Sequence, residues 1–357
     1  MTEATADGTK NRPSRGTLKR WIMRLVITVI ALPVLVALSG MAYQALATAR
    51  DVRQYPPPGK LVDVGGHRLH INTIGEGTPT VILDAGVCDC SLNWCFVQPE
   101  VAKFARVCSY DRAGMGWSEP GPMPRTSEQI VAELHALLKN AEVPGPYVLV
   151  GHSFGGYNVR LFAHEYPDEV AGLVLVDAAH EDQWPRLPDT VKGLYTGWTQ
   201  FLRTERYKSR LGFTRLFHRM WTNPKMPAEQ GATGRMLRLR TAYYDTLYSE
   251  WTEVDKASAN QVRAAASLPQ VPMMVLTAEK HGDEPPPGVT NEDFARWNAL
   301  LYEMQVDLAR RCKDSVHIKV ANSTHVIPLD QPAAVVDAIR RVMEAVREQK
   351  PLRLQSQ

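Results

Sequence analysis

The chain has 357 residues, of which 44% are apolar, so it is long enough to bury a large hydrophobic core. Lys and Arg total 41 and Asp and Glu total 38, a net charge of +3. Residues 1–24 hold six bases and two acids, a net +4, so the rest of the chain carries a net −1. A nearly neutral body lacks the broadly basic character of nucleic-acid-binding proteins, and we expect no nucleic-acid partner.

An uncharged segment, residues 25–49, follows this basic arm. A membrane-spanning helix needs about 20 predominantly apolar residues, and basic residues collect on its cytoplasmic side. We therefore expect residues 1–24 in the cytoplasm, a single transmembrane helix or signal anchor over residues 25–49, and the body beyond the membrane. A cleaved secretory leader is the alternative, because Ala45-Leu46-Ala47 and Ala47-Thr48-Ala49 both fit a small-x-small cleavage site.

A Pro-rich linker is expected over residues 50–59, and beyond it short apolar strands alternate with helical patterns. Strands are predicted at 61–64, 68–72, 80–84, 106–110, 147–150, 173–176, 273–276 and 317–320, and helices at 128–139, 154–165, 291–311 and 332–347. This alternation predicts an α/β fold whose mostly parallel sheet is covered by helices on both faces.

Residues 178–270 interrupt the alternation, because they are rich in aromatic residues and contain no clear strand pattern. We interpret them as a helical cap inserted into a core made of residues 60–177 and 271–348. A run of basic side chains lies inside the cap; its members are Arg203, Arg206, Lys208, Arg210, Arg215 and Arg219. Such a run is commonly a solvated surface, and contact with anionic lipid headgroups is the other interpretation.

Ser153 lies in the motif Gly151-His152-Ser153-Phe154-Gly155, directly between a predicted strand and a predicted helix. A tight strand–turn–helix elbow of this kind exposes a serine hydroxyl above the edge of the sheet. Gly151 and Gly155 are expected where bulkier side chains would clash in the turn. The motif therefore predicts Ser153 as a nucleophile.

A serine hydroxyl needs a general base, and His325 follows the last predicted strand at the expected place in chain order. His180 and His281 also follow strands and are its competitors. The acid that orients the base is Asp177, at the end of the strand over 173–176, with Asp283 as the alternative. Asp177 is favoured because a right-handed crossover places its strand beside the strand of Ser153.

Negative charge that develops on the substrate oxygen requires donors fixed in advance. We expect these to be the backbone N–H groups of Phe154, which follows the nucleophile, and of Val87, in the loop after the strand over 80–84.

These motifs together resemble the α/β-hydrolase superfamily, in its serine esterase and haloperoxidase-like branch. Tyr110-Asp111-Arg112 in particular resembles that family's tyrosine–aspartate–arginine loop, and the similarity extends over about residues 60–346. The resemblance implies hydrolysis of esters or related acyl bonds without a cofactor. Related dehalogenases and epoxide hydrolases carry an aspartate at the nucleophile position, where this chain has Ser153. The Asp84-Ala85-Gly86 segment departs from the His-Gly found in many relatives.

The sequence therefore predicts a serine hydrolase that cleaves carboxylic esters of an apolar small molecule. Two alternatives remain open: a membrane-tethered acyltransferase or perhydrolase with the same triad, and a non-catalytic binding protein on a hydrolase scaffold. The five cysteines, an odd number, have no partner set with metal-ligand spacing, so no metal is expected. The natural substrate and the oligomeric state are not determined by the sequence.

Overall fold

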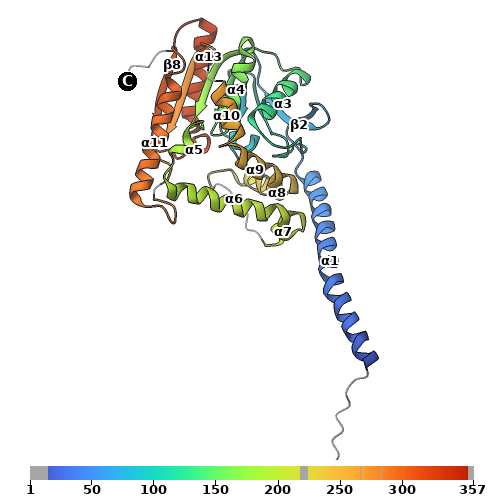
Figure 1. Cartoon of the computed structure of the whole chain (residues 1–357). Coiled ribbons are helices and arrows are strands. Elements are labelled where there is room, and N and C mark those ends of the chain that lie inside the picture. Colours follow the sequence, from blue (N-terminus) through green and yellow to red (C-terminus); the bar gives the residue numbers. More distant parts are fainter. Residues whose placement is uncertain (1–14, 218–223, 266, 283, 353–357) are drawn as a thin grey trace, which may run out of the picture.

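The computed structural model describes residues 15–217, 224–265, 267–282 and 284–352 (Figure 1). Its centre is an eight-stranded sheet in the order β1-β2-β4-β3-β5-β6-β7-β8. The strands are β1 (Lys60–Asp63), β2 (Arg68–Ile74), β3 (Thr80–Asp84), β4 (Val107–Tyr110), β5 (Tyr147–His152), β6 (Val170–Val176), β7 (Met273–Ala278) and β8 (Ser315–Val320). Only the β1–β2 and β2–β4 pairs are antiparallel. The predicted α/β class with a mostly parallel sheet is therefore confirmed.

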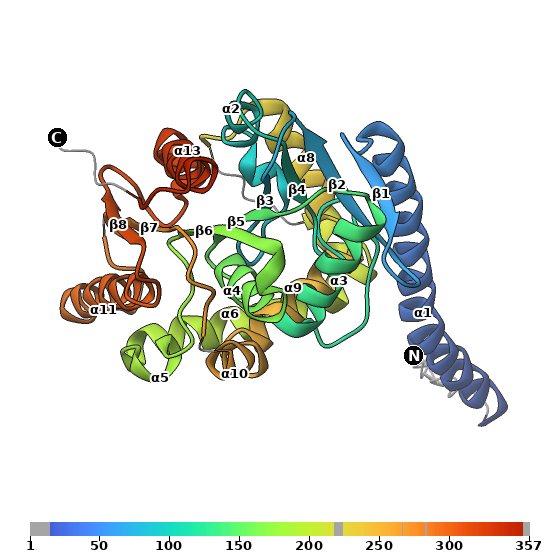
Figure 2. The same cartoon turned by 90° about the horizontal axis from the view of Figure 1, so that it is seen from above.

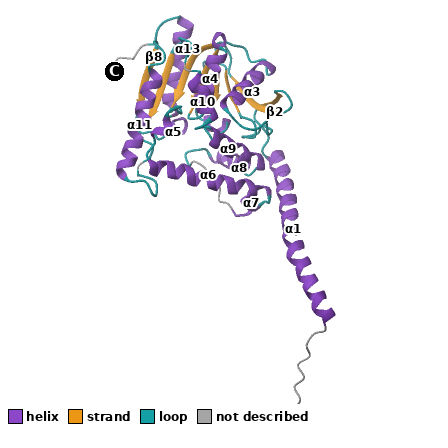
Figure 3. Ribbon diagram, viewed as in Figure 1, coloured by secondary structure: helices purple, strands orange, loops and turns teal. Residues whose placement is uncertain are grey.

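Helices surround the sheet and make up the rest of the described regular structure (Figure 3). They are α1 (Arg15–Gln54), η1 (Ser91–Trp94), α2 (Gln98–Val101), α3 (Ser127–Asn140), α4 (Gly155–Glu165), η2 (Pro167–Glu169), α5 (Gln183–Arg186), α6 (Asp189–Arg210), α7 (Phe213–Phe217), α8 (Ala228–Arg238), α9 (Thr241–Glu253), α10 (Ala257–Ala264), α11 (Asn291–Ala309), α12 (Ile327–Asp330) and α13 (Pro332–Glu348). Between β6 and β7 the described residues form helices α5 to α10 and no strand.

The central strands bury both of their faces, which is why their sequences are almost continuously apolar. Successive side chains of β5 alternate between two separate cores, since Val148 packs on one face and Leu149 on the other. Figure 2 shows the helices on the two faces: α2 and α13 on one, and α3, α4 and α11 on the other. These layers fix the carboxyl ends of the parallel strands, where the candidate site lies.

Helix α1 differs in extent from the expected anchor and linker. It runs from Arg15 to Gln54, so residues 50–54 are helical and do not belong to an extended linker. Arg50-Asp51-Val52-Arg53-Gln54 contains no helix breaker, and the prolines that end the helix begin only at Pro56. The described part of α1 includes one segment long and apolar enough to cross a membrane.

Candidate functional site

Ser153 lies at a sharp turn between β5 and α4, and its backbone has a φ of +52°. A side chain at Gly151 would collide with the carbonyl of Gly155, and one at Gly155 would collide with the carbonyl of Asp84. The turn is held from the neighbouring strand, because Ser153 N–H donates to the Val176 carbonyl at 3.1 Å. Both glycines are thus required by close backbone approach, as the motif predicted.

His325, from the loop after β8, is next to this serine. Its Nε2 lies 3.0 Å from Ser153 Oγ, and its Nδ1 lies 2.6 Å from Asp177 Oδ2. The carboxylate can only accept, so Nδ1–H donates to Asp177 and Nε2 is left to accept the serine proton. The structure therefore brings the sequence-predicted Ser153, His325 and Asp177 into one hydrogen-bonded chain. The alternative acid, Asp283, lies outside the described residues.

Asp177 is held rigidly at the end of β6, which pairs with β5 in parallel. Its N–H donates to the Leu276 carbonyl at 2.7 Å, and its Oδ1 accepts from Ala278 N–H at 3.0 Å. Burial alone would raise the pKa of this carboxyl, but hydrogen bonds from His281 and His325 outweigh burial and hold the pKa far below its usual range. Asp177 is accordingly ionised at any physiological pH.

His281 is the part of this arrangement that the sequence did not reveal. Its Nε2 lies 2.8 Å from the same Asp177 Oδ2, and its Nδ1 lies 3.2 Å from Asn298 Oδ1. The Asn298 amide nitrogen donates to the Phe294 carbonyl, which fixes the oxygen toward His281. Burial lowers the pKa of His281, but the Asp177 hydrogen bond outweighs burial and raises it. The sequence offered His281 only as a competitor of His325, and the fold reveals that it bonds to the acid itself.

The other histidines near the elbow have separate partners. His152 Nε2–H donates to the His325 carbonyl at 2.8 Å and so supports the loop that carries the base. Burial, followed by the nearby His325, lowers the pKa of His152 to about 3, which keeps its ring neutral. His180 pairs with Asp307 at 3.0 Å and does not bond to Ser153.

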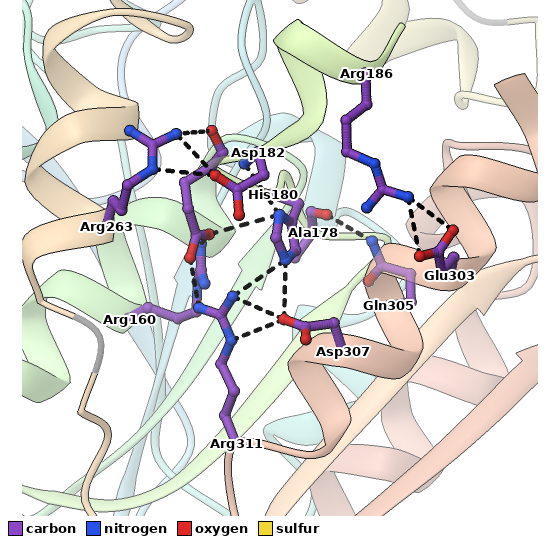
Figure 4. A network of polar contacts seen from close by, with 11 residues as sticks. Arg160, Ala178, His180, Asp182, Arg186, Arg263, Glu303, Gln305, Asp307 and Arg311 are labelled. Atoms are coloured by element: carbon purple, nitrogen blue, oxygen red, sulfur yellow. Dashed lines mark hydrogen bonds and ion pairs between the residues drawn. The ribbon is translucent and has the colours of Figure 1, made fainter.

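A polar network supports the backbone that follows Asp177 (Figure 4). Gln305 of α11 donates to the Ala178 carbonyl at 2.7 Å. Glu181 accepts from Arg160 of α4 at 2.8 Å and from Arg311 at 2.6 Å. Burial would raise the pKa of Glu181, but these two guanidinium groups lower it to about 2. Helices α4 and α11, together with the turn that follows α11, thus fix the position of the loop that begins at the proposed acid.

Val87 and Phe154, the proposed oxyanion donors, both line the cavity at Ser153. Within the described residues no hydrogen bond occupies the N–H of either. Gly86 lies so close to the serine that an added Cβ would be 3.2 Å from Ser153 Cβ. This loop is clamped by Arg112, which donates to the carbonyls of Ala85 and Gly86, each at 2.7 Å. The two free N–H groups are therefore presented on a rigid backbone.

The clamp extends into the helices between β6 and β7. Arg112 forms a buried bidentate pair with Glu250 of α9 at 2.7 and 2.9 Å and also contacts Asp84 at 2.9 Å. Burial is the largest influence on Asp84 and raises its pKa. The tyrosine–aspartate–arginine loop thus joins the oxyanion loop to the helices above the site.

The site opens into a cavity of about 710 Å³. Most of its wall surface is apolar. Polar lining residues lie at Ser153, around Glu181 and also on the helices above the site, where they are Thr196, Thr199, Gln200, Thr252, Asp255 and Lys256. The large apolar lining residues are Phe154, Tyr157, Trp184, Leu187, Tyr195, Trp251, Trp297 and Leu301. A cavity of this size and character suits a small apolar molecule with one reactive polar group.

Asp177, His281 and His325 also form a two-histidine, one-carboxylate group whose ligand atoms lie within 4.8 Å of one another. Such donors can hold a first-row transition metal. Here both imidazoles direct hydrogen-bond donors at Asp177 Oδ2 and would have to lose those protons to ligate. The observed geometry is therefore that of a hydrogen-bonded triad with an additional histidine.

Comparisons with known proteins agree with this fold. The family model of the alpha/beta hydrolase fold matches residues 79–280, more than half of the chain. A thermophilic esterase from Thermogutta terrifontis superposes with a TM-score of 0.55 at 21% identity, over 80% of this chain and 98% of that one.

Two curated relatives match over shorter segments. A 2-hydroxy-6-oxo-2,4-heptadienoate hydrolase of Pseudomonas putida is 34% identical over 34% of this chain. A probable transporter of Hormonema carpetanum is 33% identical over 36% of it. The chain spans 44% and 20% of the lengths of these two relatives. On the family match, its sheet and its elbow, the chain belongs to the α/β-hydrolase family.

Proposed function

We propose that this protein is a serine esterase that cleaves carboxylic esters of apolar small molecules through an acyl-enzyme on Ser153. The observation that carries the proposal is the hydrogen-bonded chain Ser153–His325–Asp177 at the floor of an apolar cavity. The elbow holds a serine where dehalogenases and epoxide hydrolases of this superfamily carry aspartate, which favours acyl chemistry.

The proposed mechanism follows from the geometry. His325 Nε2 removes the proton of Ser153 Oγ as that oxygen attacks the ester carbonyl, and Asp177 stabilises the imidazolium that forms. The N–H groups of Val87 and Phe154 would stabilise the resulting oxyanion. His325 then protonates the leaving alcohol, and water deacylates the enzyme by the same steps in reverse.

We also propose that residues 25–49 anchor the enzyme, with residues 1–24 in the cytoplasm and the catalytic body beyond the membrane. Support comes from the basic arm in the sequence and from the apolar outer surface of α1, on which Leu25, Ile30 and Leu35 are each about 60% exposed.

The test is Ser153→Ala, measured on p-nitrophenyl esters of graded chain length. Loss of the nucleophile should reduce turnover by several orders of magnitude and leave the circular dichroism spectrum unchanged. Ser267→Ala, an exposed serine, is the matched control and should keep wild-type turnover. Fluorophosphonate labelling at a serine other than Ser153 would refute the assignment, and transfer of the acyl group to competing nucleophiles would identify an acyltransferase.

A further inference from the structure

Most of the exposed apolar side chains of the body lie on two neighbouring helices, α6 and α7. Outside α1, the described residues include seven large apolar side chains that are exposed, and five of them lie on α6 and α7. The five are Trp198, Tyr207, Phe213, Leu216 and Phe217. Tyr207, Phe213 and Phe217 line one surface hollow, and we call the surface that they form with Leu216 the α6–α7 face. Around the axis of α6, Trp198 lies about half a turn away from Tyr207. Tyr207 is 62% exposed and Phe217 is 78% exposed. A patch of this kind on a soluble surface marks an interaction site.

The α6–α7 face lies beside the apolar helix α1. A side chain at Gly40 of α1 would collide with the carbonyl of Leu211, in the turn between α6 and α7. Arg215 of α7 donates to Gln44 at 3.1 Å and to Asp51 at 2.6 Å. In Figure 1, α6 forms the lower edge of the body, on the side toward which α1 extends. The face and the candidate anchor therefore point in the same direction.

The length of α1 places the face at the level of a bilayer surface. The uncharged segment begins at Leu25, and about 20 residues at 1.5 Å per residue span the roughly 30 Å hydrocarbon core. That count ends at Gln44, whose side chain donates to the Leu239 carbonyl at 2.7 Å. The body thus begins where the span ends, and α7 lies against that point.

The basic side chains on this face are a second and weaker feature that suits a lipid surface. Arg203, Lys208 and Arg210 are exposed on α6 among the apolar side chains. Lys208 pairs with Glu205, and Arg210 pairs with Asp245, so part of the positive charge is neutralised. Apolar contact is accordingly the main attraction, and the cations add a preference for anionic headgroups. Arg219, the last member of the basic run, lies outside the described residues.

The cavity at Ser153 approaches the same face. Gln200 of α6 lines both that cavity and the surface hollow that Tyr207, Phe213 and Phe217 line. Thr196 and Gln200, which are exposed on α6, also line the cavity. The cavity that holds the proposed nucleophile therefore adjoins the α6–α7 face along α6.

We propose that the α6–α7 face lies on the bilayer that α1 spans, and that the cavity takes its ester directly from that bilayer. The second part rests on the proposed esterase function and names its substrate class: an ester dissolved in the lipid phase. The first part rests on the proposed anchor and does not depend on the chemistry.

The contact is tested by photocrosslinking of the full-length chain in vesicles of phosphatidylcholine and phosphatidylglycerol. Phe217→benzoylphenylalanine and Tyr207→benzoylphenylalanine should give lipid adducts by mass spectrometry. Glu76→benzoylphenylalanine is the control, because Glu76 is exposed in the loop before the amino end of β3, on the far side of the sheet from α6 and α7. This position should give no lipid adducts. Equal lipid labelling at positions 76 and 217, or adducts at 217 to protein only, would overturn the proposal.

Substrate delivery is tested with two esters in the same vesicles, one water-soluble and one partitioned into the lipid. The double variant Leu216→Ser/Phe217→Ser should lower kcat/KM for the lipid-dissolved ester by about tenfold and leave the soluble ester within about twofold. Met123→Ser, another exposed apolar residue, should change neither. An unchanged rate on the lipid-dissolved ester contradicts delivery from the bilayer. If the unsubstituted enzyme cleaves neither ester, the esterase proposal fails, while the crosslinks still decide the membrane contact.

Discussion

One oxygen, Asp177 Oδ2, accepts hydrogen bonds from His325 at 2.6 Å and from His281 at 2.8 Å. The proposed base therefore shares its orienting carboxylate with a second imidazole. The shared oxygen holds His325 in one tautomer, and the second imidazole keeps the carboxylate in place when His325 moves its proton. Because of both effects, we expect substitution of Asp177 to lower turnover more than substitution of an acid with a single partner would.

Removal of this carboxylate gives the first prediction. Asp177→Asn should lower ester turnover by about 10⁴, because the amide no longer selects the productive tautomer of His325 or stabilises its charged form. Asp283→Asn, measured beside it on one ester, should stay within about tenfold of the unsubstituted enzyme. The reverse pattern would assign the acid to the loop after β7.

His281 gives a prediction about stability and pH. Its pKa is raised in the folded protein, so its protonated form stabilises the fold below the ordinary value of about 6.5, and this contribution is lost as pH rises through the raised value. His281→Gln should therefore cost about 2 kcal/mol near pH 5.5, and the deficit should shrink toward pH 9. Urea unfolding at several pH values measures it.

A matched control for that series is His164→Gln, at an exposed histidine of α4. It should change the free energy of unfolding by less than about 0.5 kcal/mol at every pH. A deficit in His281→Gln that grows with pH would mean that His281 is neutral when it bonds to Asp177.

At the scale of elements, the loop after β3 depends on a residue from another loop and on helix α9. Arg112 joins the carbonyls of Ala85 and Gly86 to Glu250 of α9, and all of these groups are buried. A buried ion pair adds little net stability, but the loss of one partner leaves an uncompensated charge. The geometry of the proposed oxyanion hole thus depends on α9.

Arg112→Lys should destabilise the protein by about 3 kcal/mol, because an ammonium cannot make the planar set of contacts to two carbonyls and two carboxylates. It should also lower kcat more than it raises KM, since the N–H of Val87 would be displaced. Arg68→Lys is the control: its pair with Glu119 is exposed, and it should cost less than about 1 kcal/mol. Thermal unfolding and steady-state kinetics check both; equal losses in the two variants would exclude a special role for the clamp.

The sequence predicted several of these elements and candidate residues, but not the contacts that join them. Short continuous apolar runs, which are typical of buried parallel strands, located the strands over 80–84 and 273–276, and the structure extends the second to Ala278. Chain order and the glycine elbow located Ser153 and His325 as candidates. The His281–Asp177 bond joins residues 104 positions apart, and the Arg112–Glu250 pair joins residues 138 apart. No local pattern encodes such contacts, since they arise only when the sheet and cap are assembled.

In the whole molecule, specific contacts attach the body to α1. Gln44 bonds to the Leu239 carbonyl and to Arg215, and Asp51 forms an ion pair with Arg215 at 2.6 Å. Gln44 and Asp51 are largely buried, although α1 is otherwise exposed. The body is therefore oriented by its helix, as the proposed contact of α6 and α7 with the bilayer requires.

These contacts bear on the choice between a retained anchor and a cleaved leader. Cleavage before Thr48 or Arg50 would remove Gln44 and leave Arg215 with Asp51, and with Thr48 only in the first case. It would also require the peptidase to cut within α1, which continues without interruption to Gln54. We therefore expect the mature protein to keep its N-terminal segment, to sediment with membranes after carbonate washing and to have the full mass of 39.9 kDa.

Protease added outside spheroplasts should digest the body and spare residues 1–24 if the basic arm is cytoplasmic. The matched variant replaces Lys19, Arg20 and Arg24 with Asn, which removes half of the bases before the span. It should yield a fraction of chains whose body is protected, because orientation follows the bias of basic residues. A mature N-terminus at Thr48 or Arg50 would instead establish a soluble exported enzyme, and the proposed contact of α6 and α7 with the bilayer would lose its anchor.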